Sequence, residues 1–401
     1  MQKNTASTSF WLKPTTVFVV YFIGINAISL QSVLAHHLNV WDIFRQSYYH
    51  LADQKDLYAF YPQEYNDSFL YSPSFSILFA PFAKLPYYLG YFAWNNLAMM
   101  LIPFLLYKLK GISTFQKAII CYVALVEMLT CLQGTQSNTI ICALIILCFL
   151  SFENKNYWLA AFAIAIGFYI KIYPLIGAVF FLLYPGKLKF LLRLFIAFIT
   201  IGILPLLLLN PSQLLQEYNN WWFILVRDQH DNYGVSLMGL IGANFGITDF
   251  SKLLVQAFGL ACFGFPLLRF RLFTNYYYRL YFLCSMLIWV VLFNHAAEIY
   301  SYAIAIFGMA LWISTQPNFK KFGIAITIFV IIVSVLPIDP SPKIISDFMQ
   351  DYNLKALPFL AVYCVLIWQM LAKDELFFGY PMVNNPVNTP GLKPALQFKI
   401  T

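Results

Sequence analysis

The sequence has few charged residues. Only 10% of its 401 residues are Asp, Glu, Lys or Arg, while 61% are hydrophobic, and the mean hydropathy is +0.69. An ordinary soluble domain is roughly 25% charged. The composition therefore excludes a soluble globular protein and indicates an integral membrane protein. The net charge of +8 does not predict a nucleic-acid partner, because the basic residues follow a membrane topology along the loops.

Several other features are missing. No cysteine lies in a polar loop: all seven fall inside apolar runs, which predicts small core residues and excludes a disulfide framework or a zinc site. No repeat of fixed period occurs. No short apolar segment with a small-residue cleavage site precedes the first apolar run, so we expect residues 14–34 to be a retained signal anchor.

Apolar runs long enough to cross about 30 Å of hydrocarbon dominate the chain. We predict an all-α bundle of about 12 transmembrane helices, within a range of 10–13, near residues 14–34, 87–107, 117–133, 135–152, 156–170, 173–184, 190–209, 250–268, 277–293, 297–314, 322–337 and 356–372. The stretch 156–184 could hold two spans, a tilted pair or a broken helix, because Pro174 removes a backbone donor and disfavours helix at Tyr173.

The charged residues of the loops predict an orientation. A cytoplasmic N-terminus puts 17 of the 25 basic residues inside and 13 of the 17 acidic residues outside, which agrees with the positive-inside rule. Two long outer loops follow, residues 35–86 and 210–249, and long loops often carry function. We expect one domain, 1–401, in the inner membrane, with a loose cytoplasmic tail at 373–401.

The first outer loop contains "NVWDIFRQSYYHLADQKDLY", residues 39–58. Helical spacing predicts an amphipathic helix lying on the membrane surface, with one apolar face and one polar face. The apolar face is Trp41, Phe44, Tyr48 and Leu51, and the polar face is Asp42, Arg45, Gln46 and Tyr49. Spacing alone favours Asp42 as an acid near a helix start, stabilised by the macrodipole, over a catalytic role. Residues 69–90 contain three prolines and predict either a re-entrant or interfacial helix pair or an ordinary connector.

Three further segments carry polar side chains near the predicted outer face. "LQGTQSN", residues 132–138, groups Gln133, Gln136 and Asn138, which suits either sugar binding or a plain turn, and Glu127 precedes it inside a span. Lys171 in "FYIKIYP" is either a phosphate-binding cation or a snorkelling lysine. The second outer loop has Arg227 and Asp228 in "WWFILVRDQHDNYG".

"FNHAAEIYSY", residues 293–302, sets His295 and Glu298 at i and i+3. The pair suits either proton transfer and phosphate binding or an interface contact, and one His with one Glu is too few for a metal site. His36 and His37 are adjacent and would not share one helical face.

Taken together, these segments resemble a known family. An early outer Asp with a Tyr pair (Asp42, Tyr48, Tyr49), "LY", "YSPSFSILFAPFAKLP", the Gln-Gly turn, "K-x-Y-P" and an outer His295 resemble the polyprenol-phosphate-mannose-dependent alpha-mannosyltransferases of the GT-C class. The resemblance covers roughly residues 15–315. The chain departs from the family pattern at Ser72, in "QGTQSN" and in "NYGVSLMGL", which leaves the sugar and acceptor open.

The resemblance implies a GT-C-type membrane hexosyltransferase. It would move mannose from a polyprenyl-phosphate carrier to a lipid- or glycan-linked acceptor on the periplasmic side, by inverting displacement with Asp42 as general base and no metal cofactor. His295 would assist catalysis, and Lys171 and Arg227 would bind the donor phosphate. The expected sugar- or acceptor-binding residues are Tyr49, Tyr71, Gln133, Gln136, Asn138 and Glu298. The rival predictions are a lipid or glycan flippase, although the two halves show no internal symmetry, and a non-catalytic subunit of an envelope complex.

Overall fold

The structure, a computed structural model, describes residues 10–231, 233–247, 250–316, 324–335 and 342–378. Within these ranges every regular element is helical and no strand occurs. The first half of the chain forms η1 (Phe10–Leu12), α1 (Pro14–Leu34), α2 (Asn39–Ala52), α3 (Pro73–Ala83), α4 (Tyr87–Lys108), α5 (Thr114–Gln133), α6 (Asn138–Glu153), α7 (Tyr157–Ile170), η2 (Tyr173–Leu183), α8 (Lys187–Gly202) and η3 (Leu204–Leu207).

The second half of the chain is also built from helices of unequal length. They are α9 (Pro211–Asp231), α10 (Leu237–Phe245), α11 (Lys252–Gly264), η4 (Phe265–Leu268), η5 (Phe270–Leu272), α12 (Tyr276–Leu292), η6 (Ile299–Ser301), α13 (Tyr302–Ser314), α14 (Ile324–Val335), α15 (Lys343–Asp351), α16 (Ala356–Ala372) and α17 (Asp374–Phe378).

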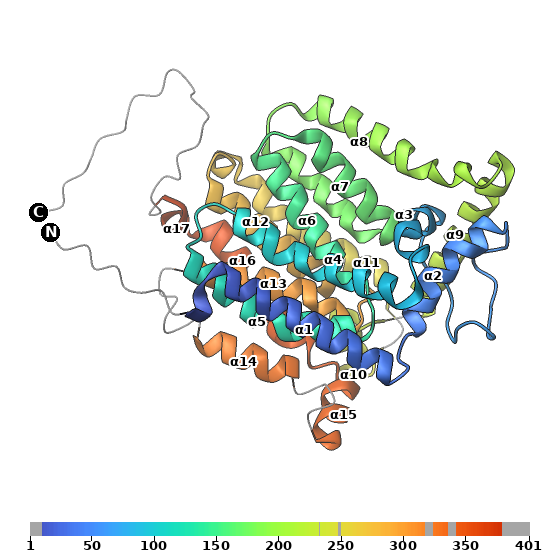
Figure 1. Cartoon of the computed structure of the whole chain (residues 1–401). Helices are drawn as coiled ribbons and strands as arrows, with labels where there is room; N and C mark the ends of the chain where they lie inside the picture. The colour runs from blue at the N-terminus through green and yellow to red at the C-terminus, as the bar shows by residue number, and fades with distance from the viewer. Residues whose placement is uncertain (1–9, 232, 248–249, 317–323, 336–341, 379–401) are drawn as a thin grey trace, which may run out of the picture.

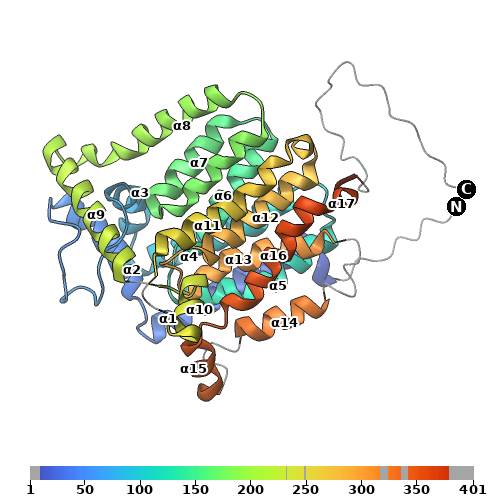
Figure 2. The same cartoon turned by 180° about the vertical axis from the view of Figure 1, so that it is seen from behind.

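The long helices lie side by side in one bundle (Figures 1 and 2). The loop end of the bundle is the end at which α2, α3 and α9 lie, and the tail end is the end at which α17 lies (Figure 1). Helix α8 lies along the edge of the bundle, where several of its large apolar side chains are exposed, as are those of α1. Apolar side chains on the outside of a bundle suit contact with lipid.

The centre of the bundle is formed by α12 and α13. Every residue of Tyr302–Ser314 is buried, so α13 has no exposed face, as expected for an interior helix. The two helices approach closely at Gly308, where an added Cβ would lie 2.8 Å from the Leu287 Cβ and 2.9 Å from the Cys284 carbonyl oxygen. A small residue at such a contact lets the helix backbones come together.

The predicted spans coincide with helices, but the count of about 12 transmembrane helices is not confirmed. Among the residues that the structure describes, four helices are long and apolar enough to cross a membrane, or five if the bent pair α15–α16 is one span. The four are α1, α4, α5 and the Lys187–Leu207 stretch. Other apolar elements, such as α6 and α7, have only 10–17 residues, which is short of the roughly 20 needed at 1.5 Å per residue. The predicted span at 322–337 is described only over Ile324–Val335.

The structure corrects the environment predicted for the first outer loop. The amphipathic helix exists as α2, but its apolar face is packed inside the protein, with Trp41, Phe44 and Leu51 fully buried. The Phe44 ring makes edge contacts with Phe75 of α3 and Trp94 of α4. Aromatic pairs of this geometry stabilise beyond the area that they bury. Protein contacts, not lipid, therefore hold α2 in place.

Two open alternatives are resolved by the backbone. Residues 69–90 hold the helix α3 and the start of the long helix α4, not two short helices. Pro73 is in the first turn of α3, and the Ser72 Oγ accepts from the Phe75 amide at 3.2 Å. In the 156–184 stretch α7 ends at Ile170 and a separate 3-10 helix, η2, begins at Tyr173, as the position of Pro174 favours. Of the predicted tail, residues 379–401 lie outside the described residues.

Candidate functional site

A cavity of about 760 Å³ opens among segments that belong to the loop end of the bundle. Its polar lining is Asp67, Tyr71, Lys171, Tyr173, Asp228, Gln256, Asn294, His295 and Glu298. The rest of its wall is apolar and includes Trp221, Trp222, Leu225 and Val226 of α9 and Leu253, Ala257 and Leu260 of α11. A large cavity with an apolar wall and a few converging polar groups is the usual form of a ligand site.

Lys171 reaches the cavity because the chain leaves helical geometry there. The residue follows the last turn of α7 with an extended backbone, φ −146° and ψ 134°. Its Nζ donates to the Asn138 Oδ1 at 3.0 Å, and the Tyr173 hydroxyl donates to the same oxygen at 2.9 Å. Asn138 is fully buried at the first turn of α6. Lys171 is the only lysine among the described residues that line the cavity. The Asn138 amide holds its ammonium in place without neutralising the charge.

His295 lies in the link between α12 and η6 and is held from two sides. Its Nε2 is 3.5 Å from the Asp228 Oδ2, and its Nδ1 is 3.2 Å from the Gln256 Nε2. An amide nitrogen can only donate, so in this arrangement Nδ1 accepts and the proton of a neutral imidazole is on Nε2, toward Asp228. Both imidazole nitrogens are engaged in this arrangement, so the Asp228 carboxylate is the group of the pair that can accept a proton from a bound hydroxyl.

Two other predicted residues, Tyr71 and Glu298, also line the cavity. The Tyr71 hydroxyl lies 3.2 Å from the Ser137 Oγ, beside Asn138. Glu298 is exposed and precedes η6. The Ser301 amide donates to the Glu298 backbone carbonyl at 2.9 Å, and the Ser301 Oγ accepts from the Glu298 amide at 3.0 Å. The structure therefore brings Tyr71, Lys171, His295 and Glu298 together at one cavity.

Asp42 does not line this cavity. Its Oδ1 accepts a 2.6 Å hydrogen bond from the Tyr87 hydroxyl. Burial raises the pKa of the Asp42 carboxyl, and the Tyr87 hydrogen bond and the nearby Arg45 charge oppose that rise. Arg45 in turn lies over the Tyr49 and Tyr87 rings, 5.0 and 5.4 Å from their centroids. Asp42 is thus part of a polar contact between α2 and the start of α4.

The remaining predicted residues also lie off the cavity wall. The Tyr49 hydroxyl donates to the Ala83 carbonyl at 2.9 Å. Arg227 is exposed on α9, and the helical turn points its neighbour Asp228, not Arg227, into the cavity. Gln133 is exposed and Gln136 half-buried in the α5–α6 turn. Asn138 is too deeply buried to line the cavity and acts on it through Lys171 and Tyr173.

Sequence reasoning missed Gln256 and the specific role of Asp228. Gln256 is the only uncharged polar side chain in the apolar helix α11, and that isolation was a usable signal. For Asp228 no local signal separates it from Arg227 beside it, because both lie in the same polar segment. Only the contact between α9 and the α12–η6 link distinguishes them. In the part of the chain that the structure describes, no three His, Cys, Asp or Glu side chains form a group that could hold a metal ion.

Comparison with known proteins identifies the family. Residues 69–334 match the sequence model of glycosyltransferase family 87, about two thirds of the chain and a range that includes Tyr71, Lys171, Asp228, His295 and Glu298 but not Asp42. None of the curated proteins matches the chain. The all-helical bundle with its apolar spans agrees with a membrane enzyme of the GT-C-like class. The chain therefore belongs to glycosyltransferase family 87 and is a membrane glycosyltransferase.

Proposed function

We propose that this glycosyltransferase moves a hexose, mannose by the resemblance above, from a polyprenyl-phosphate carrier to a lipid- or glycan-linked acceptor on the periplasmic side of the inner membrane. One observation carries the proposal: the cavity joins a single ammonium, that of Lys171, to a long apolar wall. A lysine is a compact charge suited to one phosphate, and an apolar wall suits an isoprenoid chain.

The outer part of that wall favours a lipid rather than a soluble donor. Trp222 of α9 is 66% exposed and Leu253 of α11 is 67% exposed, although both line the cavity. Large apolar side chains that are exposed and yet border a cavity are unfavourable in water. In a membrane the same side chains would contact a lipid chain that enters between α9 and α11.

The reaction that fits these groups is a single inverting displacement. The acceptor oxygen forms a bond to C1 of the sugar while the bond from C1 to the phosphate oxygen breaks. The acceptor proton passes to a protein base, and the carrier leaves as a phosphate monoester with one more negative charge. Lys171 would stabilise that charge, and the poorly hydrated cavity strengthens the attraction. No metal takes part in this proposal.

We assign the base to the Asp228–His295 pair. Both side chains line the cavity, and each is only partly exposed, with exposed side-chain fractions of 27% and 19%. Asp42, the base implied by the resemblance, keeps its role only as a prediction, because its carboxylate is bonded to Tyr87 away from the cavity lining. Family membership supports a transferase over the flippase and the envelope-subunit alternatives.

The proposal is tested by sugar transfer in proteoliposomes. Radiolabelled polyprenyl-phosphate mannose serves as donor and a lipid extract of bacterial membranes as acceptor. Wild-type protein should transfer label, and Lys171→Ala should raise the donor KM by about tenfold or more, because it removes a charged hydrogen bond to phosphate, with the acceptor KM unchanged. Lys171→Arg, which keeps the charge, is the matched control. Equal donor KM values for Lys171→Ala and wild type would contradict the phosphate role.

A further inference from the structure

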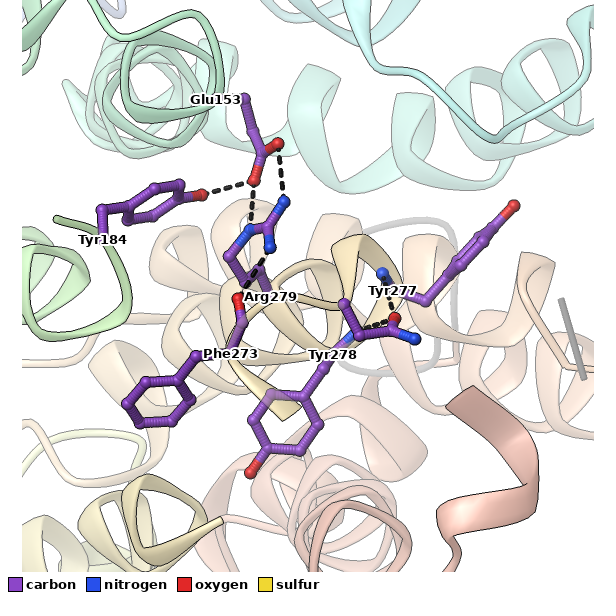
Figure 3. Close-up of polar contacts among 7 residues, drawn as sticks. Glu153, Tyr184, Phe273, Tyr277, Tyr278 and Arg279 are labelled. Atoms are coloured by element: carbon purple, nitrogen blue, oxygen red, sulfur yellow. Dashed lines mark hydrogen bonds and ion pairs between the residues drawn. The ribbon is translucent and has the colours of Figure 1, made fainter. Parts of the chain in front are cut away.

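A second polar cluster lies near the tail end of the bundle, far along the helices from the cavity. The Arg279 Nε and Nη2 donate to the two Glu153 carboxylate oxygens at 2.6 and 3.0 Å, and its Nη1 donates to the Phe273 carbonyl at 2.7 Å. The Tyr184 hydroxyl donates to the same carboxylate (Figure 3). We call Glu153, Tyr184 and Arg279 the clasp. The exposed fractions of the Arg279 and Glu153 side chains are only 7% and 10%.

The clasp joins three elements whose other ends either line the cavity or support Lys171. Helix α6 begins at Asn138 and ends at Glu153. Element η2 is preceded by Lys171 and followed by Tyr184. Helix α12 has Arg279 in its first turn and leads directly into Asn294 and His295. Each element therefore contributes one residue to the clasp and one or more to the cavity or to the support of Lys171.

Element η2 is unusually long, and residues at both of its ends are bonded to α6. It is an 11-residue 3-10 helix, whereas such helices rarely exceed three or four residues. At about 2.0 Å per residue it spans about 22 Å, close to the length of about 24 Å for the 16-residue α6 beside it. As an α-helix the same 11 residues would span only about 16 Å. Lys171 and Tyr173 bond to the first residue of α6, and Tyr184 bonds to its last.

A buried ion pair contributes little net stability, because the free energy needed to remove two charges from water offsets their attraction. Well-packed apolar residues often stabilise a fold as much as a buried ion pair does, or more. The best-attested role of a buried ion pair is to fix the register of the elements that it joins. Here the pair is bidentate and also accepts the Tyr184 hydroxyl, so it fixes the end of η2 relative to both α6 and α12.

We propose that the clasp is a positioning device for the donor phosphate: by fixing the tail end of η2 against the last residue of α6, it keeps η2 long enough to hold Lys171 and Tyr173 at the cavity. Glu153, Tyr184 and Arg279 are positioning residues that act through η2. This inference rests on the proposed role of Lys171.

Binding of polyprenyl phosphate to full-length protein in nanodiscs tests the inference, with the parent polyprenol, which lacks the phosphate, as the comparison ligand. Tyr184→Phe removes the hydroxyl and leaves the ring, which stacks on Phe152 with centroids 5.0 Å apart. The matched control is Tyr278→Phe, which removes the hydroxyl of a fully buried tyrosine of α12, bonded to the Pro266 carbonyl at 2.5 Å. Tyr278 is not part of the clasp. Thermal unfolding of both variants measures the cost to stability.

The inference predicts that Tyr184→Phe weakens polyprenyl phosphate binding by about tenfold, leaves polyprenol binding unchanged and shifts the melting temperature no more than Tyr278→Phe does. Tyr278→Phe should bind the phosphate as wild type does. Wild-type affinity for the phosphate in Tyr184→Phe would overturn the inference, and so would an equal loss in both variants. If wild type binds polyprenyl phosphate no better than polyprenol, the proposed function fails and this inference falls with it.

Discussion

At the residue scale, the proposed base can be distinguished from the base that the resemblance implies, because Asp228 and His295 line the cavity and Asp42 does not. If the cavity pair is the base, Asp228→Asn should lower kcat by about 100-fold or more, within the usual range for loss of a general base, and leave the donor KM nearly unchanged. Asp42→Asn should keep at least half of wild-type turnover. The proteoliposome transfer assay measures both variants side by side. The opposite pattern, an inactive Asp42→Asn and an active Asp228→Asn, would return the base to α2.

Glu217 of α9 predicts a dependence of stability on pH. Its Oε2 accepts from the Leu57 amide at 3.3 Å, and burial raises the pKa of its carboxyl to about 7, which the Leu57 hydrogen bond opposes and the Asp56 charge increases. Because the folded state binds the proton more tightly than the unfolded state, this group costs stability as the pH rises from about 4.5 to about 7.

Glu217→Gln removes that cost and keeps an acceptor for Leu57. The variant should therefore melt a few degrees above wild type at pH 8 and at the same temperature as wild type near pH 4. Melting curves in detergent at the two pH values make the comparison. A stabilisation that is the same at both pH values would show that packing, not charge, is responsible.

Among the elements, the contact between α12 and α13 should tolerate change least. Gly308→Ala places a Cβ within 3 Å of the α12 backbone at Cys284 and of the Leu287 side chain, so it should destabilise by about 1–3 kcal/mol. Gly264→Ala at the end of α11, where an added Cβ meets nothing within 4 Å, is the control and should be neutral or slightly stabilising. Thermal unfolding measures both, and a neutral Gly308→Ala would argue against the close contact.

The sequence predicts elements well where hydrophobic runs or prolines set their bounds. Helix α1 occupies the residues expected of it, and Pro174 separates α7 from η2. The environment of α2 could not be predicted, because a face of Trp41, Phe44 and Leu51 suits a lipid surface and a protein interior equally. The 3-10 form of η2 could not be predicted either, because no local signal shows that residues at its two ends bond to the first and last residues of α6.

For the whole molecule, the sequence predicted the class of protein and four of the nine polar residues that line the cavity. Tyr71, Lys171, His295 and Glu298 were predicted and do meet. Gln256 was not predicted, and Arg227 was preferred over Asp228. These residues could not be identified from the sequence, because α9, α11 and the α12–η6 link come into contact only in the packed bundle. Asp42 was predicted to be the base because of the motif in the first outer loop, but the structure places Asp42 away from the cavity wall.

In the proposed complex the donor phosphate binds at Lys171 and its isoprenoid chain lies between α9 and α11. An electron cryomicroscopy structure of the protein in nanodiscs with polyprenyl-phosphate mannose tests it directly. We predict phosphate density within hydrogen-bond distance of the Lys171 Nζ, the sugar facing Asp228 and His295, and the lipid chain along Trp222 and Leu253. Phosphate density beside Asp42 and Arg45, with the cavity empty, would show that the donor does not bind at Lys171.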